Sequence, residues 1–383
     1  FQPVEPPLAE ERLFVVEGAT PAELLAQLDT LRFGSPTRGV TGSEGVALAL
    51  LARTPDDLAR AVAEAREHLR QRPDQSARER FFYTPQPLRG RVAFTYPGSG
   101  NDFPGMGRAV LRRWPEIGRR QRRESRRYDA QFPVRPETME ARIAAQVALG
   151  TVLSDALVSF GVRPTAAIGY SLGESSALFG LRAWTDRDGL FETMERSRLF
   201  KSDLCGPCDV ARAEWGVDHV DWVTAIIERS ADEIRAVLPE RAYLQFIHGP
   251  RECVVGGDRL AVGVLTQRLG VAPVLVPTTT TMHCPIVRRV AQTYRELHVW
   301  PVRDTGVTFY SSSWGRAYAL TSESAADSIL AQATDTVDFT RVIEAAYADG
   351  VRIFVEAGPG ASVSRIVSQV LGDRPHAARS ACV

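Results

Sequence analysis

The sequence is poor in lysine and in long apolar runs, and it carries no net charge. Lysine occurs once among 383 residues, at Lys201, so no phosphate-binding loop of the G-x-x-x-x-G-K-[ST] type is present. No run of about 18 apolar residues occurs, which argues against a membrane-spanning helix. The formal net charge is zero. That argues against nucleic acid as the main ligand, because phosphate neutralisation needs a basic excess.

Cysteine is also scarce. The five cysteines are too few and too scattered for a disulfide framework, and they predict a reducing, cytoplasmic location. Cys205 and Cys208 have the C-x-x-C spacing of thioredoxin-type redox pairs. Such a pair normally follows a strand at a helix N-terminus, whereas this one follows an arginine-rich helical segment and is predicted to lie in a loop. No second cysteine or histidine pair completes a zinc site, so no metal is expected.

The length predicts two or three domains. Because the chain begins at Phe1 rather than a methionine, we expect it to be a piece of a longer protein. Residues 1–90 are predicted to form a small α/β unit. Its strands lie at 13–16 and 45–51, and its helices begin at Thr20-Pro21 and at Thr54-Pro55.

The stretch from Ala166 to Glu174 predicts a buried strand, a tight turn and the start of a helix. Gly169, Ser171 and Gly173 have the G-x-S-x-G spacing of a nucleophile elbow. A serine in that turn exposes its hydroxyl, and the free N–H groups of the helix N-terminus favour an oxyanion. Side chains at the two glycines would collide as strand and helix close on each other. The alternative is an ordinary strand–helix turn with a solvated serine.

A nucleophilic serine needs a base, and the residues alone leave the choice among six histidines open. His283 follows a threonine-rich stretch, Thr278 to Thr281. His219, His248 and His298 lie in polar or turn contexts without a motif.

Residues 214–278 have a different rhythm from their surroundings. Their pattern predicts the order β-α-β-β-α-β, the ferredoxin-like arrangement. We interpret this stretch as an inserted subdomain. Residues 91–213 then form the first part of a larger α/β subdomain, and residues 279–383 form its second part with a C-terminal tail.

Two further helical segments are predicted on either side of the elbow, at 139–160 and at 187–200. A dense arginine run lies between Arg112 and Arg127. Such a run is either a solvated helical face or a surface for an acidic partner or ligand phosphates.

From about Val92 to Arg365 the chain resembles the acyl-CoA:acyl-carrier-protein acyltransferases of fatty acid and polyketide synthases. Four motifs occur in the family's order. The stretch Phe94–Gly100 resembles F-x-F-P-G-Q-G, Gly169–Gly173 resembles G-H-S-x-G, Met282–Pro285 resembles F-H-S-P, and Glu356–Gly360 resembles E-x-G-P-G. Residues 1–90 resemble the linker domain between ketosynthase and acyltransferase in type I synthases.

The resemblance implies an α/β-hydrolase-like core with a parallel sheet, and it implies roles for individual residues. Ser171 would be the nucleophile and His283 its general base, oriented by the backbone carbonyl of Gln332. The backbone N–H groups of Leu172 and Ser99 would form the oxyanion hole. Arg196, which lies 25 residues beyond the serine, would bind the carboxylate of a dicarboxylic acyl group.

The implied reaction is transfer of a malonyl unit from malonyl-CoA to the phosphopantetheine thiol of an acyl carrier protein through a malonyl-serine ester, with no permanently bound cofactor. An adjacent ketosynthase of the same polypeptide is the other expected partner. Met282 before the histidine and Leu172 after the serine favour malonyl over methylmalonyl. Tyr170 and Ser99 depart from the family's usual histidine and glutamine, and a tyrosine at 170 resembles the enediyne-type iterative synthases.

Two other classes of protein remain open at this point. A serine esterase or thioesterase of the α/β-hydrolase class fits the order of serine and histidine, although an inserted ferredoxin-like subdomain does not suit it. A non-catalytic synthase scaffold, or a redox module built on Cys205 and Cys208, is the alternative outside hydrolytic chemistry.

Overall fold

A computed structural model of the chain describes residues 11–34, 45–78, 80–133, 135–276 and 280–381. The chain divides into two compact units, Phe1–Arg89 and Gly90–Val383, called unit 1 and unit 2 below. Two predicted features lie partly outside the described residues: the start of the threonine-rich stretch and the boundary at residue 278.

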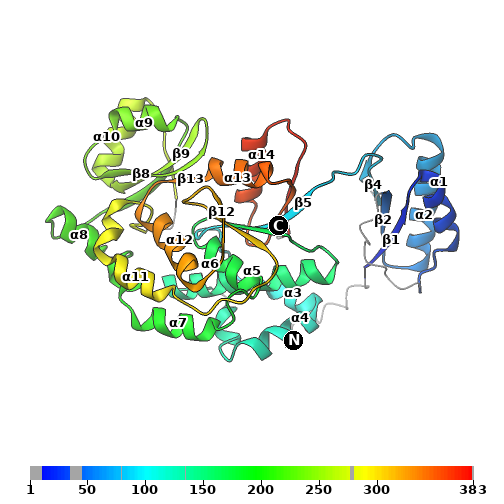
Figure 1. The fold of residues 1–383 in the computed structure, drawn as a ribbon, viewed down its shortest axis with the longest axis horizontal. Helices are drawn as coiled ribbons and strands as arrows, with labels where there is room; N and C mark the ends of the chain where they lie inside the picture. Colours follow the sequence, from blue (N-terminus) through cyan, green and yellow to red (C-terminus); the bar gives the residue numbers. More distant parts are fainter. Residues whose placement is uncertain (1–10, 35–44, 79, 134, 277–279, 382–383) are drawn as a thin grey trace, which may run out of the picture. The chain divides into compact units, whose positions relative to one another are not determined.

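Unit 1 is a four-stranded antiparallel sheet with two helices (Figure 1). The sheet order is β1-β2-β4-β3. Thr20 and Thr54 each cap a helix by accepting a hydrogen bond from a backbone N–H three residues later, as their position before proline predicts. The predicted strands and helices are therefore confirmed. Their bounds are β1 Arg12–Gly18, α1 Pro21–Thr30, β2 Val46–Ala52, α2 Pro55–Gln71, β3 Ala77–Arg78 and β4 Phe81–Tyr83.

The centre of unit 2 is a six-stranded sheet in the order β12-β11-β6-β5-β14-β15. Neighbouring strands run parallel from β11 to β15, and β12 is antiparallel to β11. The expected parallel sheet thus has one antiparallel edge strand. The strands are β5 Arg91–Tyr96, β6 Ala166–Gly169, β11 Thr308–Ser311, β12 Arg316–Tyr318, β14 Val351–Glu356 and β15 Ala377–Ser380.

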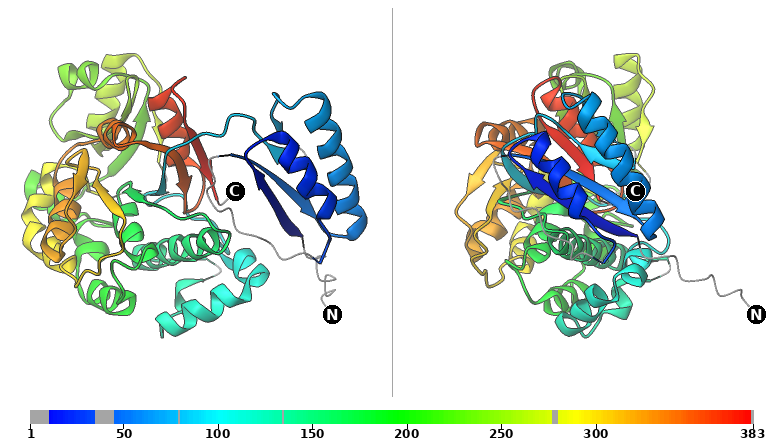
Figure 2. Two further views of the ribbon diagram at one scale, coloured as in Figure 1. Left: turned by 45° about the vertical axis from the view of Figure 1, so that its right-hand side comes forward. Right: turned by 90° about the vertical axis from the view of Figure 1, so that its right-hand side faces the viewer.

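Helices cover both faces of this sheet, because its central strands are apolar on both sides. Phe94 and Ala167 pack into the core that holds α5 and α6, whereas Ala93 and Ile168 pack into the core that holds α13 and α14 (Figure 2). The helices are α3 Arg108–Arg113, α4 Pro115–Glu124, α5 Met139–Ser159, α6 Gly173–Gly180, α7 Arg187–Arg196, α8 Asp209–Trp215, α11 Ala291–Leu297, α12 Ser322–Thr334, α13 Phe339–Ala348 and α14 Ser362–Leu371. Short helical turns lie at Asp129–Gln131, Leu199–Asp203 and Pro285–Val290.

Helix α5 is the one helix in the described residues that is long and apolar enough to cross a membrane. Its most apolar window has a mean hydropathy of 1.3, and 78% of that window is buried inside the protein. It packs against α6, which follows the predicted elbow, and it is a core helix of unit 2.

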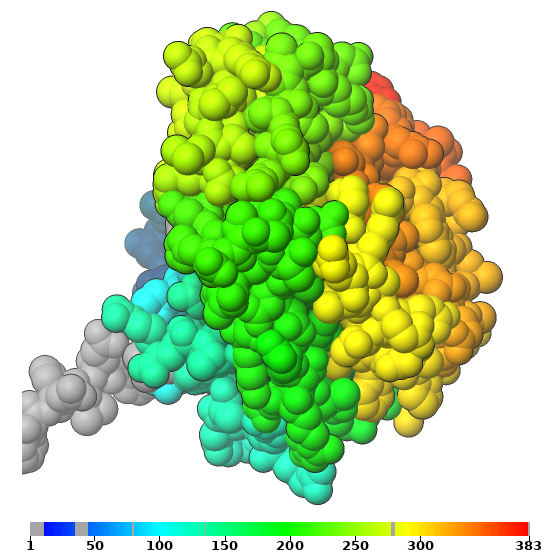
Figure 3. All heavy atoms as spheres, turned by 90° about the vertical axis from the view of Figure 1, so that its left-hand side faces the viewer, coloured from blue at the N-terminus to red at the C-terminus, as the bar shows by residue number. Residues whose placement is uncertain are grey.

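A second sheet in unit 2 has the order β10-β7-β9-β8-β13 (Figure 1). It is antiparallel except for β13, which pairs in parallel with β8. In the space-filling view of Figure 3, the yellow-green segment with its helices lies above the green segment that includes α7 and α8. The elements are β7 Trp222–Ile227, α9 Ala231–Val237, β8 Ala242–Gly249, β9 Glu252–Asp258, α10 Arg259–Leu269, β10 Val274–Leu275 and β13 Val337–Asp338.

The structure corrects two predicted helices. The helix expected to run to Phe200 ends at Arg196, because Ser197 is extended and its hydroxyl accepts a hydrogen bond from the backbone N–H of Leu199. The mostly helical stretch expected up to Phe339 is interrupted by β13, which joins the second sheet. In both places a local polar contact or a tertiary strand pairing overrides the apolar periodicity.

Candidate active site

Ser171 lies in the turn between β6 and α6. Its φ of 53° is in the left-handed region, which non-glycine residues rarely adopt. A Cβ on Gly169 would lie 2.1 Å from the backbone nitrogen of Glu174, and one on Gly173 would lie 2.0 Å from the carbonyl oxygen of Tyr96. Glycine at both positions therefore lets the turn close, as the elbow spacing predicts.

His283 lies beside Ser171, although 112 residues separate them in the chain. Its Nε2 is 2.9 Å from the Ser171 Oγ, and its Nδ1 is 2.6 Å from the backbone oxygen of Gln332. The carbonyl can only accept, so Nδ1 carries the proton and Nε2 offers its lone pair to the serine hydroxyl. Burial lowers the pKa of His283 to about 4, while the Gln332 carbonyl opposes this shift. The imidazole is therefore neutral near pH 7 and able to accept a proton.

Gln332 contacts both residues of this pair. Its backbone oxygen holds His283, and its side-chain Nε2 donates to the Ser171 backbone oxygen at 3.0 Å. The sequence predicted the first contact by resemblance and missed the second. The structure thus brings Ser171, His283 and Gln332 together in the arrangement that a serine nucleophile and its base require.

The two predicted oxyanion-hole residues also reach this site. Leu172 and Ser99 both line a cavity at Ser171. Within the described residues, neither backbone N–H has a hydrogen-bond acceptor. The loop that carries Ser99 is fixed by Gln146, whose Nε2 donates to the carbonyl oxygens of Pro97 and Gly98 at 2.8 and 2.7 Å. The buried glutamine at mid-helix in α5 was the available signal, and sequence reasoning missed it.

Glu174 anchors the other side of the turn. This fully buried carboxylate accepts hydrogen bonds from the backbone N–H and hydroxyl of Ser312 and from the hydroxyl of Ser328. Burial raises its pKa, and these hydrogen bonds oppose the shift. The first turn of α6 is therefore tied to the end of β11 and to α12.

Tyr170, the residue before the serine, begins a series of polar contacts. Its hydroxyl is 2.8 Å from His248 Nε2, and His248 Nδ1 is 2.9 Å from Glu252, which also accepts two 2.8 Å hydrogen bonds from Arg365. The His248 and Arg365 contacts lower the pKa of Glu252 to about 2. The Tyr170 ring also stacks on Phe246 with ring centroids 4.3 Å apart. Sequence reasoning assigned no role to His248, because β8 and β9 bring it beside the elbow only through tertiary contacts.

Two cavities meet at Ser171. The first, of about 60 Å³, is mostly apolar and is called the apolar cavity here. The second, of about 190 Å³, is called the polar cavity. The apolar cavity is lined by Ile143, Leu190, Met194, Met282, Leu297 and Ile329, with Ser175, Tyr294 and His298 as polar groups. The polar cavity is lined by Asn101, Tyr170, Gln245, His248, His283 and Arg365.

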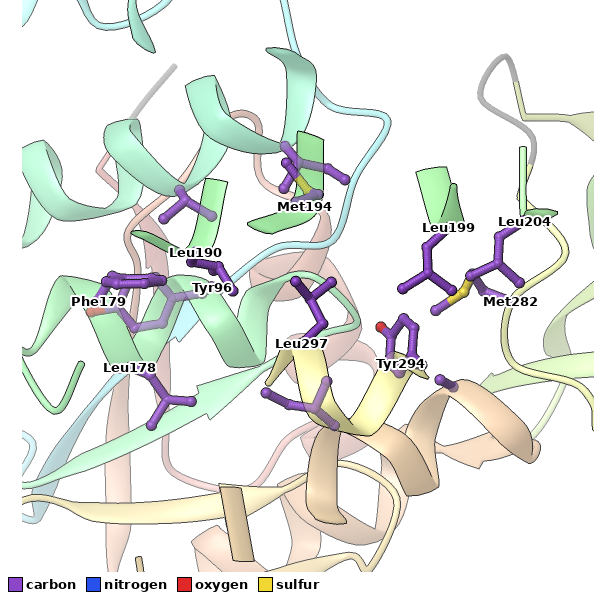
Figure 4. Packing of buried hydrophobic residues seen from close by; sticks show 14 of the residues in the cluster. Tyr96, Leu178, Phe179, Leu190, Met194, Leu199, Leu204, Met282, Tyr294 and Leu297 are labelled. Atoms are coloured by element: carbon purple, nitrogen blue, oxygen red, sulfur yellow. The ribbon is translucent and has the colours of Figure 1, made fainter. Parts of the chain in front are cut away.

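Met282 and Leu172, the two predicted specificity residues, line the apolar cavity. Met282 is 7% exposed, and its side chain lies beside Leu199, Leu204 and Tyr294 (Figure 4). Gln245 fixes its backbone by donating to its carbonyl oxygen at 2.7 Å. The long thioether therefore occupies space next to the nucleophile.

Arg196 lies outside both cavities, contrary to the prediction from its position in the sequence. Its side chain is 81% exposed and approaches Glu192 at 3.8 Å. Leu190 and Met194, four residues apart on α7, face the apolar cavity. A residue two positions beyond Met194 is rotated by about 200° around the helix axis, onto the far side. Spacing along the chain was therefore a poor guide to which way this side chain points.

The C-x-x-C pair has no redox features. Cys205 and Cys208 are buried free thiols. Burial raises the pKa of Cys205 to about 12 and that of Cys208 to about 11. A reactive redox thiol needs a lowered pKa and access, so the alternative of a redox module is not supported.

The arginine run lies on α3, on α4 and in the turn after α4. Much of it is paired: Arg120 with Glu124 and Asp155, Arg122 with Asp129, and Arg127 with Glu195. Its members are thus largely engaged in ion pairs on the surface of unit 2, which favours the interpretation as a solvated face.

Comparison with known proteins identifies the family. A model of the acyl transferase domain matches residues 93–383. The chain belongs to this family, whose members are acyltransferases.

Related sequences agree with this assignment. A polyunsaturated fatty acid synthase from Thraustochytrium sp. has a polypeptide that is 26% identical over 335 residues, covering 76% of this chain and 16% of its own length. The malonyl CoA-acyl carrier protein transacylase of Bacillus subtilis is 24% identical over 294 residues, covering 73% of this chain and 90% of its own length. The chain thus spans a small part of the first relative and nearly the whole of the second.

Solved structures share the fold. The acyltransferase domain from module 8 of the salinomycin polyketide synthase superposes with a TM-score of 0.73 at 19% identity, covering 97% of this chain and 91% of that one. The acyltransferase domain of the iterative polyketide synthase in enediyne biosynthesis gives a TM-score of 0.64 at 18% identity, with coverage of 97% and 90%. The α/β fold with mixed sheets is therefore that of acyltransferase domains.

Proposed function

We propose that the protein transfers a malonyl unit from malonyl-CoA to the phosphopantetheine thiol of an acyl carrier protein in polyketide biosynthesis. The observation that carries the proposal is the contact of Ser171 Oγ with the neutral Nε2 of His283, at the junction of two cavities. The similarity to a malonyl CoA-acyl carrier protein transacylase supplies the substrate class.

The first half-reaction would acylate Ser171. Its Oγ attacks the thioester carbonyl while His283 Nε2 takes the hydroxyl proton. The oxyanion receives hydrogen bonds from the backbone N–H groups of Leu172 and Ser99. When the tetrahedral species collapses, the C–S bond breaks and His283 returns the proton to the sulfur of CoA.

The second half-reaction would run the same steps in reverse order with a new thiol. His283 takes the proton of the phosphopantetheine thiol, and the sulfur attacks the ester carbonyl. The C–O bond to Ser171 then breaks, and His283 returns the proton to the serine Oγ. The ester must be kept from water between the two steps, or the enzyme becomes a hydrolase.

We infer that the acyl group occupies the apolar cavity and that the pantetheine arm lies in the polar cavity. The latter offers amide and charged partners, including Asn101 and Arg365, for the amide groups of the arm. In the apolar cavity, the groups available to the malonyl carboxylate are the side chains of Ser175, Tyr294 and His298. His298 Nδ1 is engaged with the Tyr294 backbone oxygen at 2.7 Å, so its Nε2 is the nitrogen left for substrate.

The domain roles belong to the same proposal. Unit 1 would be the linker from a ketosynthase of the same polypeptide. Unit 2 would combine a hydrolase-like core, residues 91–213 and 279–383, with an inserted ferredoxin-like subdomain at 214–278. Tyr170 and the similarity to the enediyne acyltransferase domain favour an iterative type I synthase. The free cysteines among the described residues fit the cytoplasm.

Incubation with radiolabelled malonyl-CoA, with and without a phosphopantetheinylated carrier protein, tests the proposal. We expect stable label on the wild-type protein that moves to the carrier, and no label on Ser171→Ala. Rapid release of free malonate without transfer would instead identify a serine thioesterase. An absence of label on the wild-type protein would identify a scaffold domain.

A further inference from the structure

A third cavity in unit 2 is lined by four arginines. It has a volume of about 420 Å³ and shares no lining residue with the two cavities at Ser171. Phe179, near the C-terminal end of α6, lines it, whereas Ser171 precedes the N-terminus of that helix. A helix of this length separates the two places by about 10 Å. The cavity is therefore distinct from the acylation site.

Two of the four arginines already have acidic partners. Arg182 donates to Glu124 and Asp155 at 2.8–3.2 Å, and Arg120 pairs with the same two carboxylates at 3.0 and 3.2 Å. Gln121 donates a further hydrogen bond to Asp155. The negative charge at the cavity is thus shared by these two guanidinium groups.

Arg187 has no such partner. Its side chain is 3% exposed, and its Nη1 and Nη2 are buried without a hydrogen-bond acceptor among the described residues. Burial lowers its pKa to about 10, and Arg182 contributes to this shift while Glu124, Asp188 and Asp155 oppose it. A buried guanidinium without a partner is costly. Arg303, which is exposed, adds a second charge without an ion pair in the described part of the chain.

The unpartnered buried atoms of the lining residues are all donors. Besides the two Arg187 nitrogens, they are Nε of Arg182 and Nε1 of Trp184. Convergent donors with an excess of two positive charges match an anion with several acceptor oxygens and a charge near −2. Guanidinium groups bind phosphate oxygens in a fork geometry that suits this arrangement.

We propose that this cavity binds a phosphate group, held chiefly by Arg187 with Arg303 at the rim and the Trp184 N–H beside it. Inorganic phosphate and the phosphates of a nucleotide share this chemistry. The volume admits more than an isolated phosphate, so the adenosine bisphosphate portion of CoA is the nucleotide source to compare with the free ion.

Thermal unfolding of the full chain tests the site with inorganic phosphate as the probe, at constant ionic strength maintained with NaCl. The variants are Arg187→Met and, as a matched control, Arg123→Met, an exposed arginine of the same region that does not line the cavity. We expect millimolar phosphate to raise the Tm of wild type and of Arg123→Met by on the order of 2–4 °C. Arg187→Met should show no such rise, and its phosphate-free Tm should equal or exceed that of wild type, because an unpaired buried charge is gone.

An equal rise in Arg187→Met, or no rise in wild type beyond NaCl, would overturn the proposal. Should Arg187→Met fail to fold, Arg303→Gln replaces it, with phosphate affinity measured by titration calorimetry. The proposal then requires a several-fold weaker affinity than that of wild type, and an unchanged affinity would overturn it. Repeating both assays with adenosine 3′,5′-bisphosphate identifies the source. A larger effect that depends on Arg187 indicates the nucleotide, and an equal or smaller effect indicates the free ion.

Discussion

The two cavities at Ser171 differ in what surrounds them, although they share the nucleophile. The apolar cavity is walled by methionine, leucine and isoleucine side chains from α5, α7, α11 and α12. The polar cavity is walled by the series of polar contacts from Tyr170 to Arg365, which links the second sheet to α14. The difference teaches that packing determines which acyl groups fit on one side, while hydrogen bonds and charge hold the other side in shape.

The largest effect is expected where the cavities meet. Ser171→Ala should lower acyl transfer by on the order of 10⁶-fold, because the covalent route is lost while the fold keeps its charges and volume. Mass spectrometry after incubation with malonyl-CoA should show no acyl adduct on the variant. An adduct of equal yield would place the nucleophile elsewhere and remove the common point of the two cavities.

The polar side should reveal itself in the pH dependence of stability. The pKa of Glu252 is lowered in the folded state to about 2, so its contribution is present above its unfolded pKa of 4.5 and is lost as the pH falls through 2. Wild type should lose on the order of 3 kcal/mol across that window that Glu252→Gln does not lose. Urea unfolding at several pH values measures this difference. Parallel curves for the two proteins would show that the contacts from Tyr170 to Arg365 add no net stability.

The apolar side should reveal itself in acyl selection. Met282 occupies space beside Ser171, and one methyl group in such a pocket is worth about 1–3 kcal/mol, or 10–200-fold. Wild type should prefer malonyl-CoA over methylmalonyl-CoA, and Met282→Ala should narrow that preference. Competition between the two labelled esters gives the ratio directly. A ratio near one for wild type would show that the flexible thioether yields to the methyl group.

A smaller effect is expected from acid on the wild-type reaction. Because the pKa of His283 is about 4, the base remains neutral down to about pH 5 and loses its function as the pH falls through 4. Self-acylation at pH 5 should therefore be within about twofold of that at pH 7. Circular dichroism at each pH controls for unfolding. An inflection near pH 6.5 would mean that the imidazole is more hydrated than its burial indicates.

The smallest effect is expected at Arg196. Because its side chain faces solvent, Arg196→Ala should change malonyl transfer by less than about twofold. His298→Ala, in the apolar cavity, is the matched comparison and should lower malonyl transfer more than acetyl transfer. A large malonyl-specific loss in Arg196→Ala would show that α7 rearranges on substrate binding and carries the arginine into the cavity.

Local patterns in the sequence were sufficient for many elements of the fold. Threonine before proline marks the starts of α1 and α2, and the elbow turn requires glycine at 169 and 173 because backbone atoms there approach within about 2 Å of a would-be Cβ. The phosphate-site residues Arg182 and Arg187 gave no such signal. An unpaired guanidinium is visible only when the carboxylates around it have been assigned to other partners.

What the sequence by itself determined is the order of the motifs, the family they belong to, and the positions of Ser171, His283 and Gln332 along the chain. Only the tertiary structure decided which side chains converge. His248 reaches Tyr170 through the second sheet, β13 leaves a helical stretch to join that sheet, and Arg196 turns away from the cavity that Met194 faces. The physical reason is that chain spacing specifies separation and helical phase only within one element. The direction of a side chain relative to a distant element depends on where the helix ends and how it packs, and both are decided by contacts that are not local.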